Sequence, residues 1–91
     1  MPKYFIERHI PGVSGFSCEE LETISKKSAD VVRDLGAGVQ WVESFVAGDK
    51  IYCIYIADSE NLIREHGRRG GFPTEIVAPV VARLDPTVGG A

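Results

Sequence analysis

Apolar and polar residues alternate in a way that places a β-hairpin at the centre of the chain, over residues 39–57. β-Branched and aromatic residues dominate both halves, and this composition is favoured on a packed, pleated surface. Gly48 lies in the connecting turn, at 47–50, where it is free to adopt a positive φ. Neither strand has a wholly polar face, as a sheet with one solvated side would have. We therefore expect both faces of the hairpin to be covered.

Two elements are predicted before the hairpin. Residues 3–10 alternate as a strand and end where proline and glycine break the pattern. A helix is expected to follow Ser17, which fits a capping box with Glu20. Its apolar residues recur at helical spacing, and Gly36 or Gly38 is expected to end it with a left-handed cap.

Two further elements are predicted after the hairpin. Asp58 or Ser59 is expected to cap a shorter helix over residues 60–69. A last strand is predicted over residues 80–84, with Pro79 at its entrance, because proline is tolerated on a sheet edge.

The resulting order, β-α-β-β-α-β, predicts an α+β, ferredoxin-like fold. In this fold two helices cover one face of an antiparallel sheet whose strands are ordered 4-1-3-2. We expect one domain spanning residues 1–91, structured over 3–86, with a flexible tail at 87–91. The helices are expected to cover Val42, Val46, Ile54 and Ile56.

The opposite face of the predicted sheet carries large apolar side chains, namely Phe5, Trp41, Phe45, Ile51 and Tyr55. Such a patch is too large to face water in a soluble protein. A twofold homodimer, packed sheet against sheet as a dimeric α+β barrel, would cover it.

Composition excludes several classes of protein. The net charge of −3 and the interspersed charges argue against nucleic acid as a partner. No secretion signal or membrane-spanning apolar run is visible, so no membrane partner is expected. Cys18 and Cys53 are too few for a disulfide scaffold and indicate reduced thiols in the cytoplasm.

Several segments resemble a family of small bacterial ferredoxin-like proteins that was long a domain of unknown function. They read MPKYFIER, GVQWVESFV, DKIYCIYIA, IREHGRRGGFP and a closing LDP. The resemblance covers nearly the whole chain, and its W-V-x-S-[FY]-V and C-[IV]-Y segments are fairly specific. A member of this family is described as nickel-binding. The resemblance implies a homodimer and, for that member, Ni²⁺ held at the dimer surface with a role in sequestration.

Candidate metal ligands begin with Glu7 and His9, which share one strand face about 7 Å apart. A carboxylate and an imidazole suit Ni²⁺ or Zn²⁺, and Glu43 could supply a third ligand. The alternative, which we favour, is that Glu7 forms a salt bridge or hydrogen bonds within the dimer, while His9 lies at its rim. His66 is either a surface ligand or general base, or a structural histidine against Leu62; the structural interpretation is preferred.

A pocket could form between the sheet and its partner, lined by Phe5, Trp41, Cys53 and Tyr55 around Glu43. A packed dimer core is the preferred alternative. No nearby cation activates Cys53, so it is interpreted as an inert buried thiol.

Three classes of function follow. The preferred one is a small metal-binding protein that binds nickel as a homodimer. The second is a small-molecule-binding protein or cofactor-free enzyme, similar to monooxygenases and isomerases of the dimeric α+β barrel type, in which Glu7, Glu43 or His66 would move protons; this rests on fold analogy. The third is a structural or ligand-sensing dimer. No catalytic residue is assigned.

Overall fold

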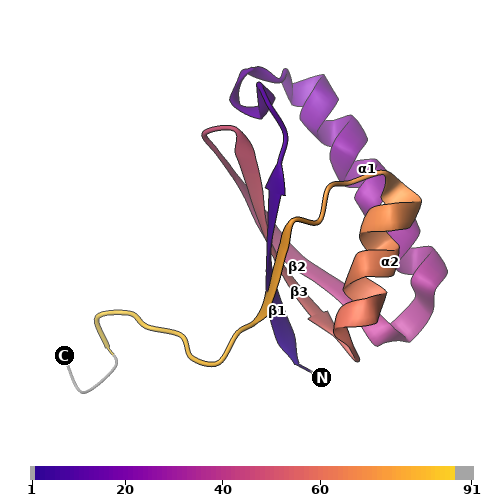
Figure 1. Ribbon diagram of the computed structural model, residues 1–91. Helices are drawn as coiled ribbons and strands as arrows, with labels where there is room; N and C mark the ends of the chain where they lie inside the picture. Colours follow the sequence, from indigo (N-terminus) through magenta and orange to yellow (C-terminus); the bar gives the residue numbers. More distant parts are fainter. Residues whose placement is uncertain (1, 88–91) are drawn as a thin grey trace.

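The structure is a computed structural model that describes residues 2–87. Two α-helices and four strands follow one another in the predicted order (Figure 1). Their bounds are β1 Lys3–His9, α1 Cys18–Leu35, β2 Val39–Ala47, β3 Lys50–Ala57, α2 Glu60–Gly70 and β4 Ile76–Pro79. Short 3₁₀ turns, Val13–Gly15 and Gly36–Gly38, flank α1.

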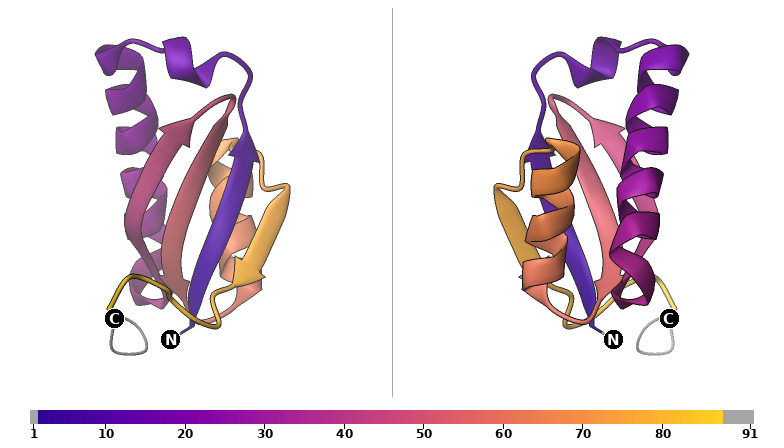
Figure 2. Two further views of the ribbon diagram at one scale, coloured as in Figure 1. Left: turned by 90° about the vertical axis from the view of Figure 1, so that its left-hand side faces the viewer. Right: turned by 90° about the vertical axis from the view of Figure 1, so that its right-hand side faces the viewer.

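The four strands form one antiparallel sheet in the order β2-β3-β1-β4. Both helices lie on the same side of it, and no helix of residues 2–87 lies on the other side (Figure 2). The α+β, ferredoxin-like prediction and its strand order are confirmed. Neither helix within residues 2–87 combines the length and the apolar character that a bilayer span requires.

The predicted helix boundaries have the expected local causes. Ser17 accepts from the backbone N–H of Glu20 at 3.1 Å, and the Glu20 carboxylate accepts from Ser17 N–H at 3.0 Å, so the capping box is complete. Gly36 ends α1 as predicted, but with φ 83° and ψ −156° it is not in the left-handed helical conformation that was expected. Ser59 caps α2, and Gly71 ends it in the left-handed conformation.

The last strand lies earlier than predicted. The prediction of 80–84 is wrong, because β4 spans Ile76–Pro79 and only one further ladder bond follows, from Val80 N–H to Lys3 O. Pro79 lies at the end of this edge strand instead of at its entrance, and proline is tolerated there because it has no N–H to donate on the free edge. Five residues, 71–75, are enough to return the chain from α2 to the sheet.

The predicted facing of β3 is inverted. Cys53 and Tyr55, expected to face a partner, are buried beneath the helices, whereas Ile54 and Ile56 lie on the open side. Ile54 pairs with Phe5 of β1. The Phe5 ring stacks on Tyr52, which lies on the same side of β3 as Ile54. The alternation was correct, but both faces are apolar, and so polarity did not indicate which one meets the helices.

In β2, a bulge changes the predicted faces. The register shifts between Trp41 and Glu43, which pair with Tyr55 and Ile54 respectively. One extra residue, Val42, therefore separates two side chains that strict alternation would put on one face. Trp41 lies on the helix side, and Glu43 remains on the open side as predicted.

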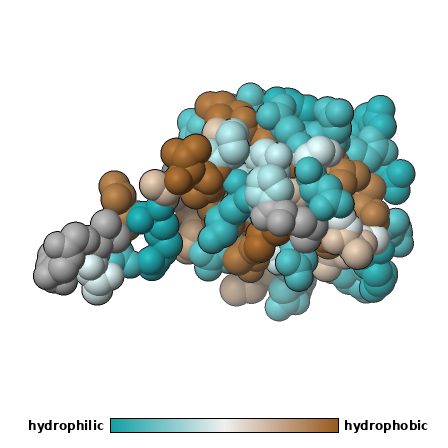
Figure 3. Space-filling model, turned by 90° about the horizontal axis from the view of Figure 1, so that it is seen from below, coloured by the Kyte–Doolittle hydropathy of each residue, from teal (hydrophilic) through white to brown (hydrophobic). Residues whose placement is uncertain are grey.

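The open side of the sheet keeps an apolar surface even after this correction. Phe45 and Ile76 are 55% and 47% exposed there. Residues 80–87 then leave the sheet as an extended C-terminal arm, with Val81 93% and Leu84 82% exposed. Apolar residues lie along this arm and on the adjoining side of the body (Figure 3). Most of the predicted tail, 88–91, lies outside the described residues.

Candidate functional site

Four polar side chains from four different elements meet beneath the helices. Arg8 comes from β1, Ser28 from α1, Tyr55 from β3 and His66 from α2, and the exposed fraction of each is below one-tenth. Ser28 Oγ lies 3.0 Å from Tyr55 Oη and 3.1 Å from His66 Nε2, and Arg8 Nη2 lies 3.5 Å from His66 Nδ1. We call these four residues the polar cluster.

The donors and acceptors of the polar cluster fix the state of its histidine. A guanidinium only donates, so Nδ1 of His66 must face Arg8 as an acceptor. The ring proton is then on Nε2, which donates to Ser28, through either its hydroxyl or its backbone oxygen at 3.3 Å. His66 is consequently neutral.

Burial shifts both titratable rings of the polar cluster. Desolvation, and secondarily the Arg8 charge, lowers the pKa of His66 to about 4. Burial also raises the pKa of Tyr55, although the hydrogen bond with Ser28 opposes this effect. At neutral pH both groups are uncharged, and Arg8 alone in the polar cluster carries a charge.

The loop after α2 holds Arg8 in place. Arg8 Nη1 donates to Pro73 O at 2.8 Å and to Thr74 Oγ1 at 3.0 Å. Its guanidinium lies 5.5 Å from the centre of the Phe72 ring, which also stacks on His66. Phe72 and Pro73 therefore anchor the loop to the core. The two glycines before them, Gly70 and Gly71, allow the chain to turn there.

A cavity of about 240 Å³ opens between α1 and the sheet beside the polar cluster. Its walls are mainly apolar, and Ser28, Tyr55 and Arg8 supply polar groups. Two of its lining residues, Ser25 and Val46, are exposed, so the cavity reaches the surface there.

Three of the four residues predicted to line a pocket against a partner instead line this cavity. Trp41, Cys53 and Tyr55 line the cavity, but it lies under α1 and not between the sheet and a partner. Phe5 and Glu43 are on the opposite side of the sheet and do not line it.

The predicted metal ligands are not brought together in one chain. Glu7 accepts from Lys50 Nζ at 3.3 Å on the open side, and His9 is exposed at the end of β1. Glu43 lies two strands away from them, and His66 is enclosed on the other side of the sheet. Among residues 2–87 no three His, Cys, Asp or Glu residues form a group able to hold a metal ion.

Sequence reasoning overlooked Arg8 and Ser28 as site residues, although each carried a signal. Arg8 alternates with Tyr4 and Ile6, so it is a charge on an otherwise apolar strand face. Ser28 interrupts the apolar stripe of the first helix. A polar residue at a core position needs a buried partner, and here the two share His66.

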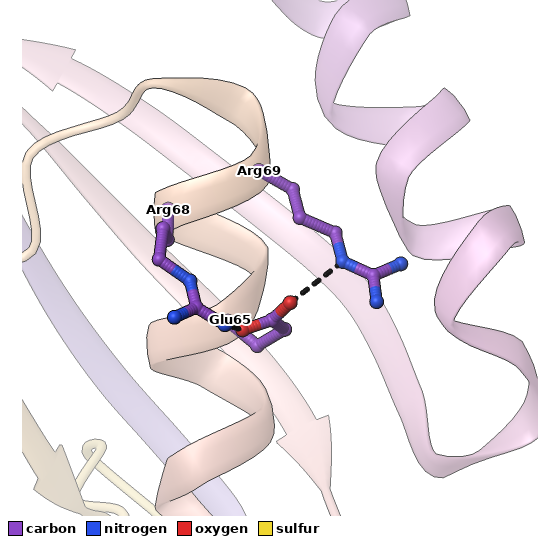
Figure 4. Close-up of polar contacts among 3 residues, drawn as sticks. All are labelled: Glu65, Arg68 and Arg69. Carbon is purple, nitrogen blue, oxygen red and sulfur yellow. Dashed lines mark hydrogen bonds and ion pairs between the residues drawn. The ribbon is translucent and has the colours of Figure 1, made fainter.

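The other arginines differ sharply from Arg8. On α2, Glu65 pairs with both Arg68 and Arg69, and its carboxylate accepts from Arg69 Nε at 2.7 Å (Figure 4). Arg64 pairs with Glu60 one turn apart. Within the described part of the chain, the hydrogen-bond partners of Arg8 are neutral groups.

The architecture and the polar cluster define a ferredoxin-like α+β protein with a small cavity under its first helix. The sequence matches the family described as nickel responsive protein SCO4226-like over residues 4–80, and the chain belongs to this family. The family resemblance predicted from the sequence is thereby confirmed.

Structural comparison agrees on the fold. The crystal structure of SCO4226 from Streptomyces coelicolor A3(2) is similar to this chain, with a TM-score of 0.74 at 16% sequence identity. The similarity covers 90% of this chain and 99% of that one. At this identity the likeness establishes the fold alone. No curated protein matches the sequence.

Proposed function

We propose that this protein binds nickel as a homodimer, with the metal held at the edge of the interface between two sheets. The observation that carries the proposal is the open side of the sheet, where Glu7 and His9 adjoin an apolar surface. Membership of a nickel-responsive family supports nickel as the metal.

The open side of the sheet supports a second copy of the chain as its partner. The exposed Phe45 pairs with the half-buried Tyr52, and Phe5 and Ile54 pair with each other in the neighbouring row. The exposed Ile76 pairs with Glu7 at the opposite edge of the sheet. Apolar patches of this kind on small proteins mark interaction sites. The C-terminal arm has two exposed apolar side chains, Val81 and Leu84. In the proposed dimer these side chains would pack against the second copy.

The donor set fits nickel only if two chains contribute to it. His9 offers an imidazole, and the carboxylate of Glu75 lies within 3.3 Å of its backbone nitrogen. Glu7 supplies a second carboxylate once it releases Lys50. Imidazole and carboxylate are suitable ligands for Ni²⁺, and a twofold axis would double this set. His66 is not part of the proposed site, because it is buried against a cation.

Calorimetric titration of the full chain with Ni²⁺ tests the proposal. We expect saturable binding that weakens at least tenfold in His9→Ala, because the imidazole is the strongest donor of the set. Glu22→Gln, which removes an exposed carboxylate from α1, is the matched control and should bind as the natural chain does. The absence of any heat at millimolar excess of Ni²⁺, or an unchanged affinity in His9→Ala, would contradict the proposal.

A further inference from the structure

We propose that the cavity under α1 is a binding site for a small monocarboxylate with an apolar body, whose carboxylate pairs with Arg8. This site is distinct from the metal site proposed above, which lies on the opposite side of the sheet. Three observations carry the inference: a buried positive charge without an anionic partner, apolar walls, and two hydroxyl groups beside the charge.

The charge of Arg8 is not neutralised by the protein. Arg8 is 3% exposed, and none of the ion pairs within residues 2–87 includes it. Burying an unpaired charge is costly unless an opposite charge and hydrogen bonds compensate for it. A guanidinium has five N–H groups. Pro73 O, Thr74 Oγ1 and His66 Nδ1 accept from three of them, and the Tyr55 hydroxyl also interacts with the guanidinium. A carboxylate in the cavity would pair with the N–H groups that these three acceptors leave over, through charge-assisted hydrogen bonds.

The lining of the cavity selects an anion with an apolar body. Arg8 is its only charged lining residue among those that the structure describes, so no carboxylate of the chain competes for the guanidinium. Most of the other lining residues are apolar, and they include Leu21, Ile24, Trp41 and Ile51. A fully hydrated anion such as phosphate would leave this surface uncovered, whereas an alkyl or aromatic group would cover it.

Size and hydrogen bonding restrict the ligand further. A volume of about 240 Å³ is below the range of roughly 300–1,000 Å³ that is usual for drug-sized ligands, so the ligand is small. Tyr55 and Ser28 line the same cavity and are bonded to each other at 3.0 Å. One of the two hydroxyl groups can turn its proton to a carboxylate oxygen. The neutral His66 behind them adds no competing charge.

Titration of the full chain with hexanoate and with 1-hexanol, in the presence of EDTA, tests this inference. Trp41 is the single tryptophan of the chain and lines the cavity, so its fluorescence reports occupancy beside the calorimetric heat. We expect hexanoate to bind at least tenfold more tightly than 1-hexanol, because only hexanoate pairs with Arg8. Equal affinities, no binding of hexanoate, or binding that EDTA abolishes would overturn the proposal.

Two variants and a control separate the charge from the cavity. Arg8→Met should reduce the affinity for hexanoate to that for 1-hexanol. The control Arg64→Met removes an exposed arginine and should leave the affinities for both compounds unchanged. Ile24→Phe narrows the cavity and leaves Arg8 in place, so it should reduce the affinity for hexanoate at least tenfold. If Arg8→Met does not fold, Ile24→Phe decides the question alone. Unchanged hexanoate binding in either folded cavity variant would overturn the proposal.

Discussion

At the centre of the molecule, the protonation state of His66 depends on its burial and on the charge of Arg8. Burial, and secondarily the permanent charge of the nearby guanidinium, lowers the pKa of the imidazole and keeps it neutral. Ser28 and Tyr55 complete the set of hydrogen bonds, and no buried side-chain nitrogen or oxygen among the described residues lacks a partner. The polar cluster therefore depends on one protonation state of His66.

This dependence predicts a loss of stability in acid. The pKa of His66 is about 4 in the folded protein, below its ordinary value of about 6.5 in the unfolded chain. The unfolded chain therefore binds the proton first as the pH falls. We expect the free energy of unfolding to decrease between pH 6.5 and pH 4 by up to about 3 kcal/mol from this group.

Urea unfolding across this pH range measures the effect. His66→Gln should flatten the pH dependence, even if it lowers stability overall, whereas His9→Gln, at an exposed position, should leave it unchanged. A natural chain whose pH dependence equals that of His66→Gln would show that His66 accepts a proton in the folded state as readily as in the unfolded one.

At the scale of elements, the end of α2 and the loop after it are packed so closely that glycine is required. A Cβ on Gly67 would lie 2.1 Å from Thr74 Oγ1 and 3.2 Å from the backbone oxygen of Phe72. By local propensity alone, a glycine inside a helix only weakens that helix. The packing role of Gly67 depends on the loop folding back to bind Arg8, which is a tertiary contact that local propensity does not contain.

Gly67→Ala should consequently destabilise the protein despite the better helix propensity of alanine. Overpacking typically costs about 1–3 kcal/mol, whereas the propensity gain is at most about 1 kcal/mol. Gly15→Ala is the matched control, because its Cβ would meet no atom within 4 Å. The midpoint of urea unfolding measures both, and a higher midpoint for Gly67→Ala than for the natural chain would contradict the described packing.

The elements that local signals define were predictable, and those that depend on long-range contacts were not. The two helix starts were predictable from their capping residues, Ser17 and Ser59. The hairpin was predictable from its turn glycine, Gly48. The position of β4 depends on how tightly the loop before it binds the core. The side of the sheet that meets the helices was equally undetermined, because both faces of β3 are apolar.

At the scale of the whole molecule, the chain is more extended than its length requires. Its radius of gyration is 13.9 Å, whereas a compact domain of this length is expected near 12 Å. The C-terminal arm extends away from the body on the open side of the sheet (Figure 1). An arm and an apolar surface on the same side are what the proposed homodimer would use.

Phe45→Asp tests the homodimer without disturbing the core, because Phe45 is largely exposed on the open side. We expect the natural chain to sediment as a dimer at micromolar concentration. The variant should raise the dissociation constant at least tenfold, which corresponds to about 1.4 kcal/mol, because a charge would be buried in an apolar interface. Thr23→Asp, on the exposed side of α1, is the control. A natural chain that sediments as a monomer would contradict the dimer.

The bulge in β2 has a further consequence for the behaviour of the chain in a crowded solution. β2 is the longest strand and lies at an edge of the sheet, with apolar residues on both faces. A flat edge of this kind would offer a template on which other chains could add strands and grow into aggregates. The extra residue at Val42 bends the edge and interrupts its ladder. The same irregularity that turns Trp41 toward the cavity thus helps to keep the chains from adding to one another edge to edge.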